Sequence, residues 1–328
     1  MQRILVRLPN WLGDVLLARP LLFALRRSFP QAEITGVAPG GLLELIAADA
    51  TLDRAEAWPP SGAGQSALVH RTREWRPEAA LVLPPSFSSA WFALRIGAPR
   101  RIGYRHELRG LLLTEALPRA PRGDVHLADE YLALGARIGA VTAPVPALRA
   151  PVAGDAEAAE LLRTHGLDHG PLALLAPGAI YGPAKRWAPE RFAAVGRSLR
   201  EAGHAIAVCG TAAEAAEAAQ VASAIGAGAV SLAGLTSLPT LAGLCARATL
   251  AVCNDSGLAH LAAACGARTV VIFGSTSPAW TAPRAPRVRI VQRAPVCAPC
   301  FQRTCRIGYR CLTAIEDRDV LAAVEATA

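Results

Sequence analysis

Three short stretches hold the residues that could do chemistry, and each directly follows an apolar run. The first is Leu12-Gly13-Asp14, just after the run 3–8. If Asp14 starts a helix, its carboxylate could act as an N-cap that satisfies free backbone N–H groups. A carboxylate at the carboxyl end of a strand is also well placed to take a proton from a bound hydroxyl. The sequence leaves both roles, cap and general base, open for Asp14.

The second stretch, 177–187, contains the only lysine of the chain, Lys185, followed by Arg186. The chain has 33 arginines, so a lysine that arginine could replace would be expected to have become one. Its retention indicates a place where a compact ammonium works and a planar guanidinium does not. Glycines in this stretch would let the backbone approach a ligand closely, although it lacks the context of a Walker A loop. We interpret it as a diphosphate clamp; the alternative is a solvated basic turn.

The third stretch is Asn254-Asp255-Ser256-Gly257-Leu258-Ala259-His260, again between an apolar run and a helical pattern. A helix beginning at Ser256 and Gly257 would offer an anion its free N–H groups and its dipole. His260 would then lie about one turn further along the same face. The same residues also form a common cap sequence, so this stretch alone does not decide between an anion site and a simple cap.

Four cysteines lie close together near the C-terminus, at Cys297, Cys300, Cys305 and Cys311. In a reducing compartment such a group predicts a structural tetrahedral metal site, with zinc first and an iron–sulfur cluster second. Because the spacing is not a paired CxxC…CxxC, four ordinary thiols remain the alternative. The other cysteines sit in apolar runs typical of a core; they are Cys209, Cys245, Cys253 and Cys265.

Short apolar runs alternate with helical patterns along the whole chain. The strands predicted most clearly are 3–8, 32–38, 78–84 and 171–178, with later ones at HAIAVCG, TLAVCN and TVVIFG. Strands that alternate with helices predict parallel sheets covered on both faces. In such sheets, ligands bind beyond the carboxyl ends of the strands, which is where the three stretches lie.

A stretch rich in proline and alanine, about 141–156, predicts a linker between two domains, 1–155 and 156–328. The fold class expected is therefore α/β, with two Rossmann-like parallel-sheet domains that face a central cleft. Pro20 predicts a kink or a restart in the first helix, which should reach about Ser28. The stretch 188–203 predicts an amphipathic helix with Pro189 in its first turn.

Length and composition favour a folded protein of about two domains. The chain has 328 residues, 52% of them hydrophobic, and no apolar run reaches the ~18 residues of a spanning helix. Charged residues interrupt the apolar N-terminus, which argues against a signal peptide and predicts a cytoplasmic protein with reduced cysteines. The net charge of +8 is spread evenly along the chain, which fits anionic small substrates or an anionic membrane surface better than nucleic acid.

The three stretches, in this order, resemble glycosyltransferase family 9, the ADP-heptose:lipopolysaccharide heptosyltransferases. The residues that carry the resemblance are NWLGDVLLARPLL, GPAKRW and VCNDSGLAHLAAACGARTVVIFGSTSP, and the last two resemble the heptosyltransferase II branch. The resemblance spans nearly the whole chain. It implies a GT-B fold, an ADP-heptose donor bound by the C-terminal domain, and a lipid-linked acceptor (lipid A–Kdo–heptose) bound by the N-terminal domain at the inner membrane surface.

The resemblance also implies roles for single residues. Asp14 would be the catalytic base of an inverting transfer. The nucleotide sugar would be bound by Lys185, Asp255, Ser256 and Gly257, with His260 nearby and Glu214 at the ribose. No cofactor would be needed for catalysis, and a zinc ion on the four cysteines would be a structural addition.

Two other functions remain open from the sequence. One is a GT-B transferase that uses another nucleotide sugar or acceptor, because loops of this type recognise diphosphates better than sugars. The other is a non-catalytic nucleotide- or nucleic-acid-binding protein, suggested by the cysteines and by seven arginines without an acid between Arg284 and Arg310. It predicts strongly salt-dependent binding to nucleic acid and leaves Asp14 and Lys185 unexplained.

Overall fold

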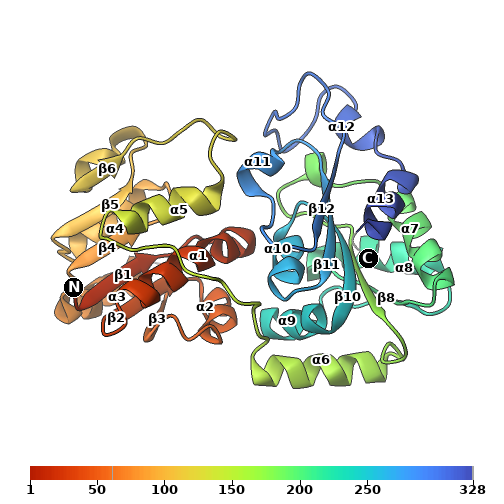
Figure 1. Ribbon diagram of the computed structural model, residues 1–328, viewed down its shortest axis with the longest axis horizontal. Coiled ribbons are helices and arrows are strands. Elements are labelled where there is room, and N and C mark those ends of the chain that lie inside the picture. The colour runs from red at the N-terminus through yellow and green to blue at the C-terminus, as the bar shows by residue number, and fades with distance from the viewer. Residues whose placement is uncertain (61, 327–328) are drawn as a thin grey trace. The chain divides into compact units, whose positions relative to one another are not determined.

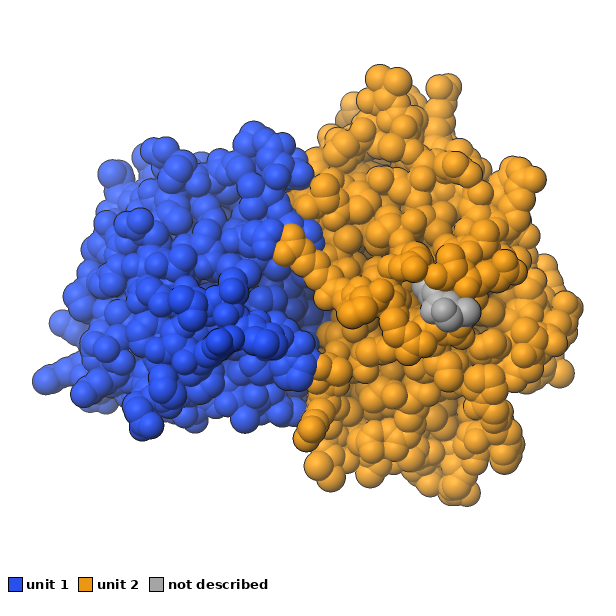
Figure 2. All heavy atoms as spheres, in the orientation of Figure 1, with its two compact units in different colours: residues 1–146 blue, residues 147–328 orange. Residues whose placement is uncertain are grey.

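The computed structural model describes residues 1–60 and 62–326, which divide into two compact units (Figures 1 and 2). Unit 1 is Met1–Pro146 and unit 2 is Ala147–Ala328. The division falls inside the stretch 141–156. That stretch is not all linker, because a helix of unit 2 already begins at Val152.

Unit 1 is a six-stranded parallel sheet with helices. Its strands are β1 (Arg3–Arg7), β2 (Glu33–Ala38), β3 (Arg54–Ala57), β4 (Ala79–Val82), β5 (Arg100–Tyr104) and β6 (Glu115–Leu117). Its helices are α1 (Leu12–Ser28), α2 (Gly40–Ala47), α3 (Gly62–Trp75), α4 (Phe87–Arg95) and α5 (Leu127–Ala136), with the 3-10 helix η1 (Glu107–Leu112). The strand order is β3-β2-β1-β4-β5-β6, which is the Rossmann order.

Unit 2 repeats this arrangement. Its strands are β7 (Leu172–Ala176), β8 (Ala205–Val208), β9 (Ala229–Ser231), β10 (Ala248–Asn254), β11 (Arg268–Phe273) and β12 (Val288–Gln292). Its helices are α6 (Val152–Thr164), α7 (Pro189–Glu201), α8 (Ala215–Ile225), α9 (Leu238–Arg247), α10 (Gly257–Ala264), α11 (Pro278–Thr281), α12 (Arg310–Thr313) and α13 (Asp317–Glu325), with the 3-10 helices η2 (Pro183–Lys185) and η3 (Ala212–Glu214). The order β12-β11-β10-β7-β8-β9 reverses direction between β7 and β10, as unit 1 does between β1 and β4.

The central strands are buried on both faces, as parallel strands under two helical layers must be. Every residue of β4 and of β7 is buried. The predicted parallel α/β architecture is therefore confirmed in both halves. Helix α1 continues unbroken through Pro20, so the predicted restart at that residue is wrong. Within residues 1–60 and 62–326, no helix is both long and apolar enough to cross a bilayer.

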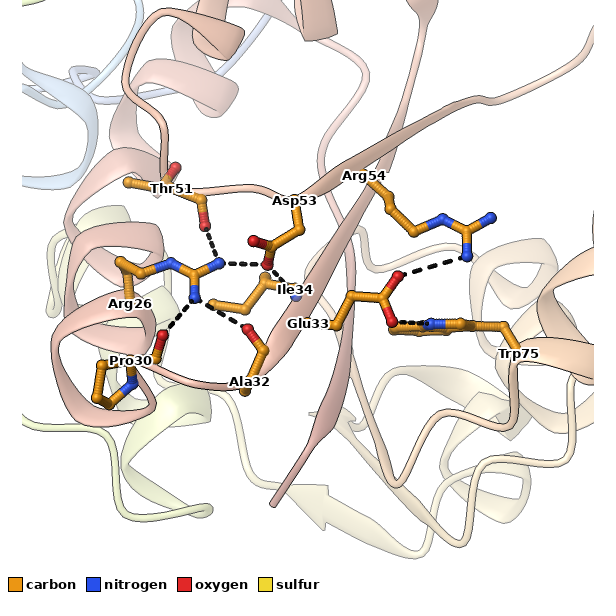
Figure 3. Close-up of polar contacts among 9 residues, drawn as sticks. All are labelled: Arg26, Pro30, Ala32, Glu33, Ile34, Thr51, Asp53, Arg54 and Trp75. Atoms are coloured by element: carbon orange, nitrogen blue, oxygen red, sulfur yellow. Dashed lines mark hydrogen bonds and ion pairs between the residues drawn. The ribbon is translucent and has the colours of Figure 1, made fainter.

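Polar contacts fix the outer strands of unit 1 to its first helix (Figure 3). The Arg26 guanidinium, near the end of α1, donates to the carbonyl oxygens of Ala32 at 2.9 Å and Thr51 at 3.3 Å and pairs with Asp53. Asp53 in turn accepts from the Ile34 N–H at 2.7 Å. These contacts close the β1–α1–β2 crossover, which leaves the opposite, N-terminal end of α1 at the carboxyl edge of the sheet.

Candidate functional site

The loops at the reversal point of unit 2 hold the predicted nucleotide-binding residues. The loop after β7 contains Lys185, and the loop after β10 begins with Asp255. Strands β7 and β10 are hydrogen-bonded neighbours, so the two loops leave the same edge side by side. In an open parallel sheet, this crevice at the reversal of strand order is where ligands bind.

Lys185 and Asp255 form a close ion pair. The Lys185 Nζ lies 2.5 Å from the Asp255 Oδ2, and the two side chains are 13% and 3% exposed. The Thr276 hydroxyl donates to the same carboxylate oxygen at 2.6 Å. Lys185 is thus held in place by a buried carboxylate, so the solvated basic turn considered from the sequence is wrong.

Asn254, the last residue of β10, ties the lysine loop to the sheet. Its side-chain oxygen accepts from the Trp187 N–H at 3.1 Å, and its amide nitrogen donates to the Pro177 carbonyl oxygen. Pro177 and Trp187 bracket the whole loop that carries Lys185. Asn254 is fully buried, so it holds both ends of this loop from the protein interior.

Two hydroxyl groups at this edge are buried without hydrogen-bond partners among the described residues: the Oγ atoms of Ser256 and Ser275. Ser256 is the N-cap residue of α10, as predicted, but its side chain does not cap the helix. Gly257 begins α10, and His260 is buried in its second turn. Free backbone N–H groups at a helix N-terminus, together with these two serine hydroxyl groups, suit an anionic ligand.

Sequence reasoning missed Ser275 and Thr276 as site residues. Both are buried in the loop after β11, the neighbour of β10. A signal was present, since a Gly-Ser-Thr-Ser segment directly follows the apolar run that forms β11. Only the structure shows that Thr276 bonds to Asp255, because strand order determines which loops meet.

Glu214 joins the same edge from the neighbouring strand β8. Its Oε2 accepts from the Thr211 N–H at 2.9 Å and from the Thr211 hydroxyl at 2.8 Å, which completes a capping box. Its Oε1 is buried and accepts no hydrogen bond from the described residues; the Arg186 guanidinium is 3.9 Å away. A Cβ atom on Gly178 would come within 2.2 Å of Oε1, so a larger residue there would displace this carboxylate.

The cysteine-rich segment, defined as 297–311, packs directly on the lysine loop. The Arg303 carbonyl oxygen accepts from the Ala184 N–H at 3.0 Å, and the Arg303 Nε donates to the Tyr181 carbonyl oxygen at 2.7 Å. The Tyr181 hydroxyl donates to the Phe301 carbonyl oxygen at 2.5 Å. The Tyr181 ring also lies 4.8 Å from the Lys185 Nζ. The position of this segment therefore determines the backbone around Lys185.

The four predicted metal-ligating cysteines lie in this segment as free thiols. Cys297 is exposed, Cys300 and Cys305 are half-buried, and Cys311 is buried. The Cys305 sulfur accepts from the N–H groups of Ile307 at 3.4 Å and Tyr309 at 3.3 Å, and these hydrogen bonds lower the pKa of Cys305. Over the described part of the chain, no three side chains of His, Cys, Asp or Glu gather into a metal-binding group.

The remaining cysteines are largely core residues, as predicted. Cys209, Cys245 and Cys253 are buried, while Cys265 is half-buried. Burial raises the pKa of Cys209 to about 12. The Cys209 side chain therefore packs in the core just after β8. It remains a protonated thiol at neutral pH and is not a nucleophile.

Asp14 lies at the corresponding edge of unit 1. It is the third residue of α1, whose N-cap is Trp11, so the prediction that Asp14 caps the helix is wrong. The half-buried carboxylate lies in the first turn, where the helix dipole favours its charge. Helix α5 packs on α1 and carries Tyr131, whose pKa is raised well above its usual value by burial and then by the Asp14 charge. Asp14 thus lies beyond the carboxyl end of β1, in the first turn of α1.

Known proteins resemble this chain over nearly its whole length. The family model of glycosyltransferase family 9 (heptosyltransferase) matches residues 66–310. Lipopolysaccharide heptosyltransferase 2 of Salmonella typhimurium is 32% identical over 307 residues, and that of Escherichia coli K12 is 31% identical; each match covers 88% of both chains.

Solved structures of family 9 enzymes resemble this chain in the same way. ADP-heptose LPS heptosyltransferase II of Escherichia coli superposes with a TM-score of 0.83 and 28% identity, covering 99% of this chain and 98% of that one. A family 9 glycosyltransferase from Veillonella parvula has the same fold, with a TM-score of 0.86 at 24% identity over 99% and 97% of the two chains. The two Rossmann-like units therefore form the α/β GT-B fold predicted from the sequence. The chain is a member of glycosyltransferase family 9, the heptosyltransferase family.

Proposed function

We propose that this enzyme transfers L-glycero-D-manno-heptose from its ADP conjugate to an inner-core heptose of lipopolysaccharide, with inversion at the anomeric carbon. The relatives with about 30% identity over 88% of the chain are heptosyltransferases 2, which supports this reaction. Unit 2 would bind ADP-heptose, and unit 1 would bind the lipid A–Kdo–heptose acceptor.

The observation that carries the proposal is the arrangement of one lysine and two serine hydroxyl groups at the carboxyl edge of the unit 2 sheet. Lys185 is fixed by Asp255, and the Ser256 and Ser275 hydroxyls beside the N-terminus of α10 have no partner among the described residues. The oxygen atoms of a diphosphate would accept hydrogen bonds from these two hydroxyl groups and would interact with the positive charge of Lys185. Glu214 Oε1, equally without a hydrogen bond within residues 1–60 and 62–326, would accept from a ribose hydroxyl.

We propose a mechanism that uses Asp14, Lys185 and the N-terminus of α10. Asp14 takes the proton of the acceptor hydroxyl while its oxygen forms a bond to the anomeric carbon. The bond from that carbon to the diphosphate oxygen breaks, and its electron pair leaves with ADP. Lys185 and the N-terminus of α10 stabilise the charge that grows on the departing diphosphate. We propose that this electrostatic stabilisation lets the reaction proceed without a catalytic metal.

The direct test is ADP release with ADP-heptose and a mono-heptosylated Kdo–lipid A acceptor, without added metal. UDP- and GDP-sugars run in parallel. Turnover with ADP-heptose alone supports the proposal. Turnover with another nucleotide sugar would instead assign a different donor to the same fold.

Glu214 offers a test of ribose recognition. In Glu214→Gln the capping box with Thr211 is kept, because glutamine forms the same box. A charged hydrogen bond to ribose becomes a neutral one, so we expect ADP affinity to fall about tenfold while Tm stays unchanged. Calorimetry with ADP measures the first and thermal melting the second. Unchanged affinity would remove Glu214 from the ribose site.

We further propose that Cys297, Cys300, Cys305 and Cys311 bind one structural zinc ion. Four sulfur donors suit zinc, and the Cys305 sulfur accepts two backbone N–H groups. Because no three of these side chains gather into a metal-binding group among the described residues, zinc binding would have to draw the four sulfur atoms together. The ion would fix the cysteine-rich segment and, through Arg303, the lysine loop. Its role would be structural.

The zinc proposal predicts coupled losses of metal and nucleotide affinity. We expect about one zinc per chain by elemental analysis, and little in Cys305→Ser. ADP affinity should fall in that variant because the brace on the lysine loop is lost. Cys265→Ser, outside the segment, should keep both. If Cys305→Ser retains its metal, or if the wild type holds none, the site is wrong.

Finally, we propose that the enzyme works in the cytoplasm at the inner face of the cytoplasmic membrane and binds no nucleic acid. The acceptor is lipid-linked in the proposed reaction. Arginines of the segment 284–310 make contacts within the protein. Arg289 donates to the Ala326 carbonyl oxygen, Arg293 pairs with Asp319, and Arg303 donates to the Tyr181 carbonyl oxygen.

A further inference from the structure

An apolar surface on unit 1 remains exposed although nothing in the proposed chemistry uses it. It comprises Phe87 and Trp91 of α4 and Leu108 and Leu111 of η1, and we name it the α4–η1 surface. Their exposed fractions are 52% and 46% for the aromatic residues and 72% and 83% for the leucines. Exposed large apolar side chains that gather on neighbouring elements mark a candidate interaction site.

Helix α4 is oriented with its largest side chains outward. Phe87 and Trp91 are one turn apart and stack with ring centroids 6.4 Å apart. The opposite face buries the smaller Ser89, Ala90 and Ala93 together with one aromatic residue, Phe92. Folding of unit 1 alone would favour burial of both large rings. Their exposure on one face of α4 therefore marks a surface that a partner could cover.

The second part of the surface is fixed against the first. Helix η1 packs on α4, and the buried Arg109 of η1 donates to the Pro84 carbonyl oxygen at 2.7 Å, just before α4. Leu108 and Leu111 are three residues apart, so in a 3-10 helix they project from the same face. The two elements are thus fixed to each other, and each carries exposed large apolar side chains.

The part of the sequence that forms this surface is rich in arginine and poor in acidic residues. The stretch 84–113 contains five arginines and one acid, Glu107. Arg95, at the end of α4, and Arg105, just before η1, are both exposed. Neither guanidinium has an ion pair or a hydrogen bond with the described residues. Tryptophan and phenylalanine next to arginine are typical of groups that sit at the headgroup level of a bilayer.

We propose that the α4–η1 surface docks on an anionic phospholipid bilayer. The aromatic and leucine side chains enter the interface, and Arg95 and Arg105 meet the headgroup phosphates. This inference rests on the proposed function in one respect: a lipid-linked acceptor would require the enzyme at a membrane. The surface follows β4 and β5, next to β1 and the Asp14 loop, so docking there would bring the acceptor-binding edge of unit 1 to the bilayer.

The test is co-flotation of the full chain with vesicles of phosphatidylethanolamine and phosphatidylglycerol, compared with phosphatidylcholine alone. We expect binding to the anionic vesicles that weakens with salt. Leu111→Ser combined with Trp91→Ser should reduce the partition coefficient on the order of tenfold or more. Arg95→Gln and Arg105→Gln should each reduce it about fivefold. Leu235→Ser, at a leucine of unit 2 that is 57% exposed, should leave it unchanged.

The controls separate this proposal from the rest. ADP binding and Tm of the Leu111→Ser, Trp91→Ser variant should match the wild type, which shows that the fold and the donor site are intact. Equal flotation of variant and wild type would overturn the proposal. So would a wild-type dimer that does not float and that this variant converts to a monomer, since the surface would then join two copies. Failure of the transferase assay with normal flotation would instead count against the proposed reaction alone.

Discussion

Asp14→Asn should reduce turnover roughly 10²–10⁴-fold while ADP binding stays unchanged. The substitution keeps the size and the hydrogen-bonding oxygen of the side chain but removes its ability to accept a proton. ADP would bind at unit 2, so its affinity does not depend on this carboxylate. Steady-state ADP release from ADP-heptose and acceptor measures the first quantity, and calorimetry with ADP measures the second.

The fold should tolerate this change. Asp14 is the third residue of α1 and not its N-cap, so no side-chain cap is lost. The favourable interaction of its charge with the helix dipole contributes ~0.3–1 kcal/mol, too little to unfold the unit. Asp124→Asn, at an exposed carboxylate of the same unit, serves as the matched control and should keep full activity. Near-normal turnover of Asp14→Asn would show that another group is the base.

The parallel architecture could be read from the sequence because its signals are local. Strands such as β7 and β4 are continuous apolar runs that end at a proline or glycine turn. Helix α7 has Pro189 at its start and Gly203 in a left-handed conformation just beyond its end. These features depend on neighbours in the chain, and no tertiary contact was needed to recognise them.

Where prediction failed, packing outweighed a local preference. Pro20 lacks the N–H that an intact helix would use, and it favours a break. Yet α1 is buried along much of its length against the sheet and α5, and it continues through the proline. Likewise, the residues from Val152 onward look like linker by composition, but α6 packs on α9 and is helical.

Candidate site residues could be named one by one from the sequence, but the contacts between them could not. Lys185, Asp255 and Ser256 were identified from loop position and from the solitary lysine. That Asp255 holds Lys185, and that Thr276 holds Asp255, follows only from the strand order that places three loops at one edge. The contacts between the cysteine-rich segment and the lysine loop could not be predicted for the same reason. About 120 residues separate Tyr181 from Phe301, whose carbonyl oxygen accepts its hydrogen bond.

Lys185→Ala should weaken ADP binding on the order of 10²–10³-fold, the effect of removing a preorganised charge from an anion site. Two physical causes act together. The diphosphate loses its nearest cation, and Asp255, 3% exposed, is left as an uncompensated negative charge beside it. Breaking a buried pair by removing one partner also costs about 3–5 kcal/mol of stability. The single variant therefore mixes a binding effect with a folding effect.

The double variant Lys185→Met, Asp255→Asn separates them. Both charges are removed together, methionine fills the volume of the lysine stem, and asparagine can still accept from Thr276. Replacing a buried pair by neutral groups is often neutral for stability, so Tm should return toward the wild-type value. ADP affinity should stay low, because no cation replaces Lys185. If the double variant binds ADP as the wild type does, Lys185 serves only to neutralise Asp255, and the diphosphate must be held by the α10 N-terminus and the serine hydroxyls alone.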